Sequence, residues 1–347
     1  MSNIRLYPSG QEVTCESGDT VLSALEKAGY AIPNNCRAGA CGECKIKVLK
    51  GEYDQGFIMD MALSQEERAE GYGLMCMAKP TGEELEIEWG TDDAQPKLFP
   101  PKENIYFQVV DRVQRTPRII ELRLRPLGAP MRFWPGQFVM VGDERNGIPM
   151  RSYSIANIPN ADGEICLMIT KVDEGMTSGW IHENLQPGTR VMINGPYGTF
   201  IGDPSVDKPV MCMAAGSGLA PILSLTGAAL ARGYKAPVTL IFSAQHQEDM
   251  MYRGLLEFWA SKYRNFKWYC TYTQDDSAEL RGRIPTILKD ISQDLSEHGV
   301  YIAGGPGFVE DCSAKAMALG ADKDQIHTEG FFDQFVPERP PKERLMG

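Results

Sequence analysis

The sequence predicts a multidomain protein with three folds in series: a small α+β unit, an antiparallel β-barrel and an α/β unit with a parallel sheet. Three observations support this prediction. The length of 347 residues suits two or three domains. Proline-containing breaks interrupt the chain near residues 92–104 and 201–209. The spacing of predicted strands and helices also changes at each break.

The first unit, residues 1–92, is small and acidic. It holds eight Lys or Arg and sixteen Asp or Glu residues, so it carries most of the net charge of −11. The stretches "IRLYP" and "EVTCES" predict a hairpin, and "DTVLSALEKAGY" predicts a helix with Asp19 as its cap. The following stretch, "TDDAQPKLFPPKEN", contains three prolines and few apolar residues, which predicts a linker over 93–104.

The second and third units differ in how strands follow one another. Short strands with turn signals, from "YFQVVDRV" to "RVMINGPYGTF", predict an antiparallel barrel or sandwich over 105–203. From "VMCMAAGSGLAPILSLTGAALARG" onward, apolar strands alternate with helical stretches. This alternation predicts a parallel sheet with helices on both faces over 204–347.

Composition narrows the class of protein. The negative net charge makes nucleic acid a poor partner, because phosphate binding needs a basic surface. No apolar run approaches the roughly 18 residues of a membrane span. The first residues lack the pattern of a signal or transit peptide, and nine cysteines are an odd number for a disulfide framework. We therefore expect a cytoplasmic protein without a membrane span.

Three cysteines fall within nine residues in "CRAGACGEC". Cys36, Cys41 and Cys44 are spaced C-x4-C-x2-C, and Cys76 stands farther along the chain. This spacing is typical of plant-type sites in which four thiolates hold a 2Fe–2S cluster, and the glycines let backbone amides turn toward the cluster. A zinc site and unligated buried thiols are the alternatives. Zinc sites usually pair two C-x2-C units, whereas only one is present here.

Two motifs in the second unit suit a bound nucleotide. In "RSYSIAN", alternation along a strand places Arg151 and Tyr153 on one face, with Ser154 on the other face or at a bend. Arg offers a fork for pyrophosphate, Tyr a flat surface and Ser a hydroxyl. In "KVDEGMTSGWIHENL", a helix opens at Thr177 and Ser178, where free amides favour a phosphate. An ordinary helix cap is the alternative for Ser178.

The third unit opens with "VMCMAAGSGLAPI", which reads as strand, glycine turn and helix. Gly216, Gly218 and Pro221 form G-x-G-x-x-P, at the place where dinucleotide phosphates meet a helix start. A tight turn without a ligand is the alternative. The second strand of this unit leads into "FSAQHQEDMMYRG", where Glu248 and Asp249 would repel a 2'-phosphate. This stretch favours NADH over NADPH.

These motifs resemble known families when they are taken in order. Residues 1–92 resemble a plant-type ferredoxin, a β-grasp fold, since "CRAGACGEC" matches its C-R-x-G-x-C-G-x-C loop. The R-x-Y-S strand and the phosphate turn, followed by "NGPYGTF", resemble the flavin-binding barrel of the ferredoxin–NADP reductase superfamily. The whole order is similar to NADH-dependent reductase components of bacterial multicomponent oxygenases, of the phenol hydroxylase and soluble methane monooxygenase type.

The resemblance implies roles for individual residues. Arg151 would contact the FAD pyrophosphate, Tyr153 would pack on the isoalloxazine, and Ser154 would approach its N5. In the closing "HTEGFF", Glu329 and Phe331 would lie beside the flavin, which makes them catalytic candidates together with Tyr153 and Ser154. The implied metal ligands are Cys36, Cys41, Cys44 and Cys76. Further implied cofactor-binding residues are Lys171, Gly175, Met176, Thr177, Ser178, Gly216, Gly218, Pro221 and Gly304.

One position departs from the family pattern. In "VYIAGGPGFVED", Ala303 stands where the family usually has the Cys that lies by the nicotinamide. The resemblance implies that hydride transfer could be slower in this chain.

The implied function is that of an enzyme, an NADH-dependent flavin and iron–sulfur oxidoreductase. Nicotinamide gives two electrons as hydride and a cluster carries one, so FAD belongs between them. We expect the cluster to pass electrons to a partner oxygenase or hydroxylase that docks at the acidic ferredoxin unit. The alternatives are a reductase of the same build for another acceptor, such as a deoxysugar-forming dehydratase, and a non-enzymatic flavin and iron–sulfur redox sensor.

Overall fold

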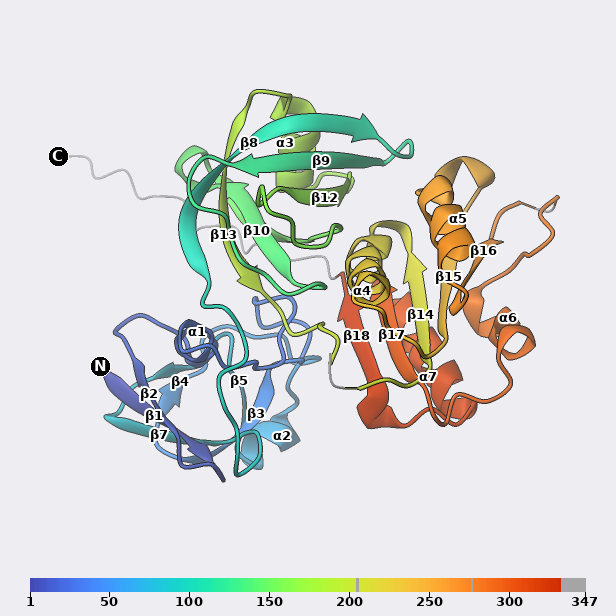
Figure 1. The fold of residues 1–347 in the computed structure, drawn as a ribbon. Coiled ribbons are helices and arrows are strands. Elements are labelled where there is room, and N and C mark those ends of the chain that lie inside the picture. The colour runs from blue at the N-terminus through green and yellow to red at the C-terminus, as the bar shows by residue number, and fades with distance from the viewer. Residues whose placement is uncertain (204–205, 276, 332–347) are drawn as a thin grey trace.

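The computed structural model describes residues 1–203, 206–275 and 277–331. Three large sheets follow one another along the chain, and Figure 1 shows their units in blue, green and yellow-to-red. A fourth, two-stranded sheet belongs to the first unit. The predicted series of an α+β unit, an antiparallel barrel and a parallel-sheet α/β unit is confirmed.

The first unit has a mixed sheet of order β2-β1-β7-β3-β5. β1 pairs parallel with β7, and the other pairs are antiparallel. Apolar side chains of α1, including Leu22 and Leu25, pack on this sheet. The elements are β1 (Ser2–Tyr7), β2 (Glu12–Cys15), α1 (Val21–Lys27), β3 (Lys45–Lys50), β4 (Tyr53–Asp54), α2 (Gln65–Ala69), β5 (Tyr72–Leu74), β6 (Lys79–Pro80) and β7 (Glu84–Glu88).

The cap of α1 differs from the prediction. Thr20 caps the helix, because its hydroxyl accepts a hydrogen bond from Ser23 N at 3.2 Å. Asp19 instead binds Lys27 Nζ at 2.8 Å. The prediction was wrong by one position, since both residues are common caps and only the backbone geometry decides between them.

The second unit is an antiparallel sheet of order β11-β10-β13-β8-β9-β12. A bridge between Ile155 and Leu167 links its two edges and curls the sheet into a barrel. α3 packs against β11 and β12. The elements are β8 (Lys102–Gln114), β9 (Ile119–Pro126), β10 (Phe138–Asp143), η1 (Glu144–Asn146), β11 (Ile148–Ser154), β12 (Ile165–Thr170), α3 (Met176–Asn184) and β13 (Arg190–Tyr197).

The third unit has a parallel sheet of order β16-β15-β14-β17-β18. α4 and α5 pack on one face and α6 and α7 on the other, and each face has its own apolar core. The elements are β14 (Val210–Ala215), η2 (Gly216–Gly218), α4 (Leu219–Ala231), β15 (Val238–Ala244), η3 (Gln247–Asp249), α5 (Arg253–Lys262), β16 (Phe266–Tyr272), α6 (Ile284–Ile291), β17 (Gly299–Gly304), α7 (Pro306–Ala318), η4 (Lys323–Gln325) and β18 (Ile326–Gly330).

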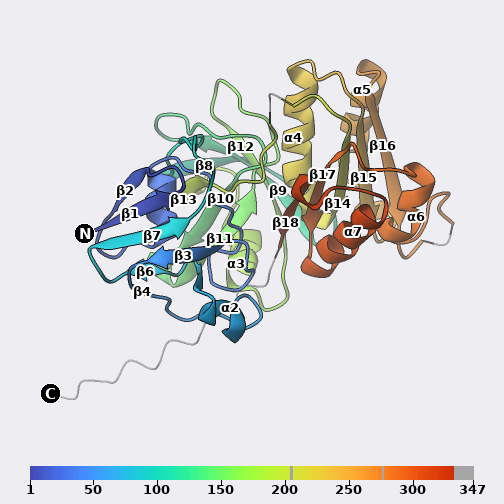
Figure 2. The ribbon, with the colours of Figure 1, turned by 90° about the horizontal axis from the view of Figure 1, so that it is seen from below.

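The three units pack against one another. β18 is an edge strand of the third sheet, and Figures 1 and 2 show it on the side that faces the other two units. The segment between the first and second units is also held in place. Lys97 N and Leu98 N donate to Gly29 O at 2.8 and 2.9 Å, and Trp134 Nε1 donates to Lys97 O at 3.2 Å. No helix in the described part of the chain is long and apolar enough to cross a membrane.

Candidate functional site

The four cysteines predicted as ligands lie together in the first unit. Cys36, Cys41 and Cys44 belong to the loop between α1 and β3, and Cys76 follows β5. Cys36, Cys44 and Cys76 are buried, and Cys41 is partly exposed. Thiol hydrogen bonds join Cys36 to Cys41 and Cys44 to Cys76, and Cys76 N donates to Cys44 Sγ at 3.4 Å. The structure therefore arranges these thiols as two pairs.

Backbone amides are directed at the sulfur of Cys36. Ala38 N and Ala40 N each lie 3.4 Å from its Sγ. The hydrogen bond with the Cys41 thiol, together with these amides, lowers the pKa of Cys36 although burial opposes the shift. This environment favours a thiolate, which is the form that binds iron.

The cysteine loop fits a two-iron cluster. Among the residues that the structure describes, no three or more His, Cys, Asp or Glu side chains are grouped as a site for a metal ion. A 2Fe–2S cluster takes four cysteine thiolates, and the two thiol pairs supply that number. Gly39 has a φ of +68°, and a Cβ there would lie 2.9 Å from Ile58 Cγ2. Only glycine allows this close packing of the loop.

Strand β11 carries the R-x-Y-S residues. Arg151 is half-buried, and its Nη1 donates to Met150 O at 2.9 Å. Burial raises the pKa of Tyr153, and the positive charge of Arg151 lies close enough to oppose that rise. Ser154 is buried and pairs in register with Phe138 of β10. The guanidinium and the phenol are therefore neighbours, as the alternation along the strand predicts.

The predicted phosphate turn opens α3. Gly175 is the N-cap, and the helix begins at Met176. Thr177 Oγ1 donates to Pro149 O at 2.7 Å, which ties the turn to β11, and Ser178 Oγ donates to Gly175 O at 3.3 Å. Both hydroxyls thus bind the chain itself. The backbone amides of the first helical turn are the groups left to bind a phosphate.

Lys171 precedes Val172, which is hydrogen-bonded to this turn, but the ammonium group of Lys171 is directed elsewhere. Its ammonium is 3.6 Å from the carboxylate of Glu183, which belongs to the last turn of α3. The structure therefore places this lysine beside the end of α3 opposite to the phosphate turn.

The glycine loop of the third unit has the shape of a nucleotide-binding turn. Gly216 has a φ of +55°, and a Cβ there would meet nothing within 4 Å. At Gly218 a Cβ would lie 2.2 Å from Ala303 O, so this glycine lets α4 approach β17 closely. Pro221 is buried in the first turn of α4. Open space at one glycine and close packing at the next are what a bound pyrophosphate requires.

A buried carboxyl joins the second and third units. Ser154 Oγ donates a hydrogen bond to Glu329 Oε1 across the interface between the barrel and β18. Burial raises the pKa of Glu329 to about 8, although the Ser154 bond opposes the shift. The other oxygen, Oε2, is buried without a hydrogen-bond partner among the described residues. This atom could be satisfied by a polar edge of a bound group, so the site fits a flavin ring.

The remaining predicted residues lie beside this carboxyl. Phe331 N donates to Gly304 O at 2.8 Å, at the carboxyl ends of β17 and β18. Ala303 is buried and pairs in register with Glu329. Gly304, Glu329 and Phe331 therefore form one cluster at the edge of the parallel sheet where nucleotides bind in such folds.

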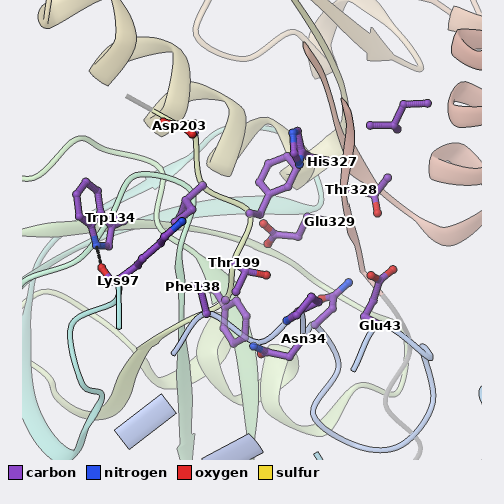
Figure 3. Close-up of a pocket in the computed structure, with 18 residues that line it drawn as sticks. Asn34, Glu43, Lys97, Trp134, Phe138, Thr199, Asp203, His327, Thr328 and Glu329 are labelled. Carbon is purple, nitrogen blue, oxygen red and sulfur yellow. Dashed lines mark hydrogen bonds between the residues drawn. The ribbon is translucent and has the colours of Figure 1, made fainter. Parts of the chain in front are cut away.

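A cavity of about 760 Å³ lies where the three units meet. Figure 3 shows Glu329 facing it from β18, Phe138 and Thr199 from the barrel, and Asn34 and Glu43 from the first unit. Its volume falls in the range of small-molecule sites. The catalytic carboxyl candidate and the cysteine loop thus border the same space.

Sequence reasoning missed three residues at this junction. Asn35 and Arg37 flank the predicted ligand Cys36 and contact the other units, and Tyr197 of β13 lies under Arg37. Arg37 is part of the C-R-x-G pattern and Tyr197 of "NGPYGTF", which were available signals. Asn35 carries no pattern of its own, and neither stretch indicates these contacts, because they join segments far apart in the sequence.

Three family models match the chain in succession. Residues 4–81 match a 2Fe-2S iron-sulfur cluster binding domain, residues 107–201 an oxidoreductase FAD-binding domain, and residues 212–314 an oxidoreductase NAD-binding domain. The predicted cofactor classes, a 2Fe–2S cluster, FAD and a nicotinamide nucleotide, are confirmed, as is the assignment to the oxidoreductases.

Curated relatives span nearly the whole chain. The reductase subunit of an aromatic O-demethylase from Amycolatopsis sp. is 32% identical over 330 residues, which cover 93% of this chain and 96% of the relative. The reductase component DmpP of phenol 2-monooxygenase from Pseudomonas sp. is 33% identical over 282 residues, which cover 81% of this chain and 79% of the relative. The predicted resemblance to phenol hydroxylase reductases is confirmed.

A relative of a different system and a solved structure complete the comparison. A CDP-6-deoxy-L-threo-D-glycero-4-hexulose-3-dehydrase reductase from Yersinia pseudotuberculosis is 29% identical, and the match covers 97% of this chain and 99% of the relative. The crystal structure of the Amycolatopsis cytochrome P450 reductase GcoB superposes with a TM-score of 0.88 at 27% identity. The match covers 96% of this chain and 100% of that one.

The ligand assignment can be tested by removing one thiol from each pair. Cys36→Ser and Cys76→Ser should each lose most of the iron and keep flavin, because the FAD-binding residues lie in another unit. Iron and flavin contents of the purified proteins measure this. Cys212→Ser, which removes a buried thiol far from the loop, is the matched control. A Cys36 or Cys76 variant with the full cluster spectrum would overturn the assignment.

The buried carboxyl predicts a pH dependence of stability. The folded pKa of Glu329 is about 8, whereas its ordinary value is 4.5. Between these values the folded chain holds a proton that the unfolded chain has released, so the free energy of unfolding should fall as pH rises. Glu329→Gln should remove this fall. Above pH 8, its free energy of unfolding should exceed that of the parent by on the order of a few kcal/mol. Urea unfolding below, within and above this pH range measures the difference. A difference that does not change with pH would show that the carboxyl is already ionised in the folded protein.

Proposed function

Because this chain belongs to the family of reductases that join 2Fe–2S cluster binding, FAD-binding and NAD-binding domains, we propose that it passes electrons from NADH to a partner oxygenase or hydroxylase. One observation carries the proposal. The cysteine loop, the barrel and the strand that bears Glu329 border a single cavity, so the groups that each unit binds would meet there. Such proximity is what transfer between the groups requires.

The residues named above would hold the three groups. When bound, the nicotinamide gives two electrons as hydride, the flavin takes them together, and the cluster carries them singly. Arg151 and the amides of the α3 turn would hold the pyrophosphate of FAD, with Tyr153 against its ring system. The loop at Gly216 and Gly218 would hold the pyrophosphate of the nicotinamide nucleotide.

Ser154 and Glu329 would handle a proton beside a bound flavin ring. With a pKa of about 8, the Glu329 carboxyl holds a proton at neutral pH and can donate from one of its oxygens. Ser154 Oγ fixes the orientation of the carboxyl through its bond to Oε1. Burial excludes water from both groups. The pair is therefore suited to lend a proton beside a ring nitrogen without exchange with solvent.

The partner would dock where the first unit is both acidic and locally apolar. The segment after β4 covers the cysteine loop, because Met59 N donates to Gly39 O at 3.0 Å. On this segment the side chains of Phe57 and Met61 are 68% and 83% exposed, and Asp60 is exposed beside them. We define Phe57, Asp60 and Met61 as the docking patch. Asp60 pairs with Arg68 at 2.8 Å, so the patch itself offers an apolar contact surface. The net negative charge of the first unit favours a basic partner.

A second acceptor class has an observation in its favour. The Yersinia relative, a reductase named for a hexulose dehydrase, covers 97% of this chain at 29% identity. A deoxysugar-forming dehydratase is therefore the alternative acceptor. The redox-sensor alternative finds less support, because the loop at Gly216 and Gly218 keeps the geometry of a nucleotide site.

The absence of disulfides among the described cysteines supports a cytoplasmic location. All nine cysteines of the chain lie in the described residues and are free thiols. Cysteines that form no disulfides, including those predicted to bind the cluster, persist in reducing compartments. We therefore place the protein in the cytoplasm as part of this proposal.

The proposed function predicts NADH as the donor. Gln245 is exposed just after β15, and η3 follows with the exposed Glu248 and with Asp249. A 2'-phosphate placed there would meet the carboxylates of Glu248 and Asp249. Anaerobic NADH should bleach the flavin and then the cluster of the holoprotein. kcat/KM for NADH should exceed that for NADPH by about tenfold or more, the effect of one unfavourable contact. Equal values would refute the choice of donor, and an unbleached cluster would refute the function.

The docking patch predicts which surface delivers electrons. Cytochrome c serves as a basic one-electron acceptor. Phe57→Ser with Met61→Ser should lower kcat/KM for cytochrome c by about fivefold or more, while NADH still reduces the flavin at the parental rate. Phe258→Ser is the matched control, because Phe258 is 54% exposed on α5, in another unit. An equal effect of both changes would remove the patch from the proposal.

A further inference from the structure

Two side chains that flank a ligand cysteine reach into the other units. Asn35 Nδ2 donates to Gly330 O at 2.6 Å, which joins the cysteine loop to β18 beside Glu329. On the other side of Cys36, the guanidinium of Arg37 lies 4.1 Å from the centre of the Tyr197 ring in β13. The loop is thus held from both sides of one ligand.

Arg37 is fixed within its own unit as well. Its Nη1 lies 2.6 Å from Glu26 Oε1, and the side chains of Arg37 and Glu26 are only 17% and 5% exposed. Removing one partner of such a buried pair leaves an uncompensated charge, which is strongly destabilising. The ion pair therefore anchors the guanidinium to α1, and its flat face remains available to stack on Tyr197.

The backbone of Arg37 supports a special role for this position. Its φ is +54°, a left-handed conformation that non-glycine residues adopt rarely and at a cost. That conformation turns the side chain away from the path of the loop and toward the barrel. Lysine could supply the charge here, but it has no planar group to stack on the ring.

The contacts of Asn35 and Arg37 complete a closed ring of contacts that includes Ser154 and Glu329, the residues predicted to lie beside the flavin. The Tyr197 ring lies 6.0 Å from that of Phe138, and Phe138 pairs in register with Ser154. Ser154 bonds to Glu329, and the next residue, Gly330, accepts the bond from Asn35. Each of the three units contributes to this ring, and the cavity shown in Figure 3 lies against it.

We propose that Asn35 and Arg37 form a clamp that sets the position of the cysteine loop relative to the flavin site. The inference rests on the proposed function for its purpose, and on the contacts above for its geometry. Both are positioning residues: neither carries electrons, and both act by holding Cys36. The clamp commits the Cys36 side of the loop to the flavin and leaves the side under Met59 and Met61 to an outside partner.

The test separates the hydride step from the transfer between flavin and cluster. In the holoprotein, Arg37→Gln and Tyr197→Leu should slow electron transfer from flavin to cluster by about tenfold or more, because a small displacement of reacting groups has a large effect on rate. Reduction of the flavin by NADH should keep the parental rate. Anaerobic rapid mixing, with optical detection of flavin and freeze-quench magnetic resonance of the cluster, measures both steps.

A second readout follows the clamp without electron transfer. Amide hydrogen exchange over residues 34–41 should speed up in Asn35→Ala, Arg37→Gln and Tyr197→Leu, since a loop that loses its outer contacts opens more often. Tyr197→Phe should keep the parental rates of amide exchange and of electron transfer, because it retains the aromatic ring under Arg37. Lys50→Gln, which breaks the exposed 2.8 Å pair with Glu84 in the same unit, is the matched control and should change neither.

The outcomes decide the clamp separately from the function. Parental exchange and parental transfer rates in Tyr197→Leu and Arg37→Gln would overturn the clamp. If Arg37→Gln fails to assemble its cluster, Tyr197→Leu still tests the same contact from the barrel. If the parent itself passes no electrons from NADH to the cluster, the proposed function fails, and the exchange experiment alone decides whether the loop is clamped.

Discussion

The hydrogen bond between Ser154 and Glu329 is the contact on which the arrangement of this protein depends. It joins the barrel to the last described strand, and it holds a carboxyl that burial keeps protonated near neutral pH. A buried carboxyl without a partner would cost several kcal/mol, so this interface is favoured only when the two units meet in register. The cavity beside it then receives walls from all three units.

A second constraint is close backbone approach. The cysteine loop can turn its amides toward sulfur because Gly39 fits where any Cβ would strike Ile58. In the third unit Gly218 lets a helix start against Ala303 O. Both loops would direct main-chain amides at a bound group, while the four cysteine side chains would be the ligands of the cluster. The hydroxyls of the α3 turn, by contrast, bind the chain itself.

The first unit has two sides with different surroundings. Its Cys36 side faces inward, where Asn35 and Arg37 contact β18 and the barrel. Its other side is covered by the segment with exposed Phe57 and Met61. Electrons could therefore enter and leave by different faces, and the packed units would not have to separate. The segment at Lys97 and Leu98, bound to Gly29, supports this fixed arrangement.

The sequence by itself determined the three folds and the cofactor classes, and it predicted four cysteine ligands, because each is encoded in local spacing: C-x4-C-x2-C, R-x-Y-S and G-x-G-x-x-P. Local patterns left the cap of α1 one residue off and gave no sign of the contacts made by Asn35 and Tyr197. Only the tertiary structure decided which residues meet at the junction, since Ser154 and Glu329 are 175 positions apart and Asn35 and Gly330 are 295 apart. Contacts of that separation arise from how whole units pack, and no periodicity along the chain records them.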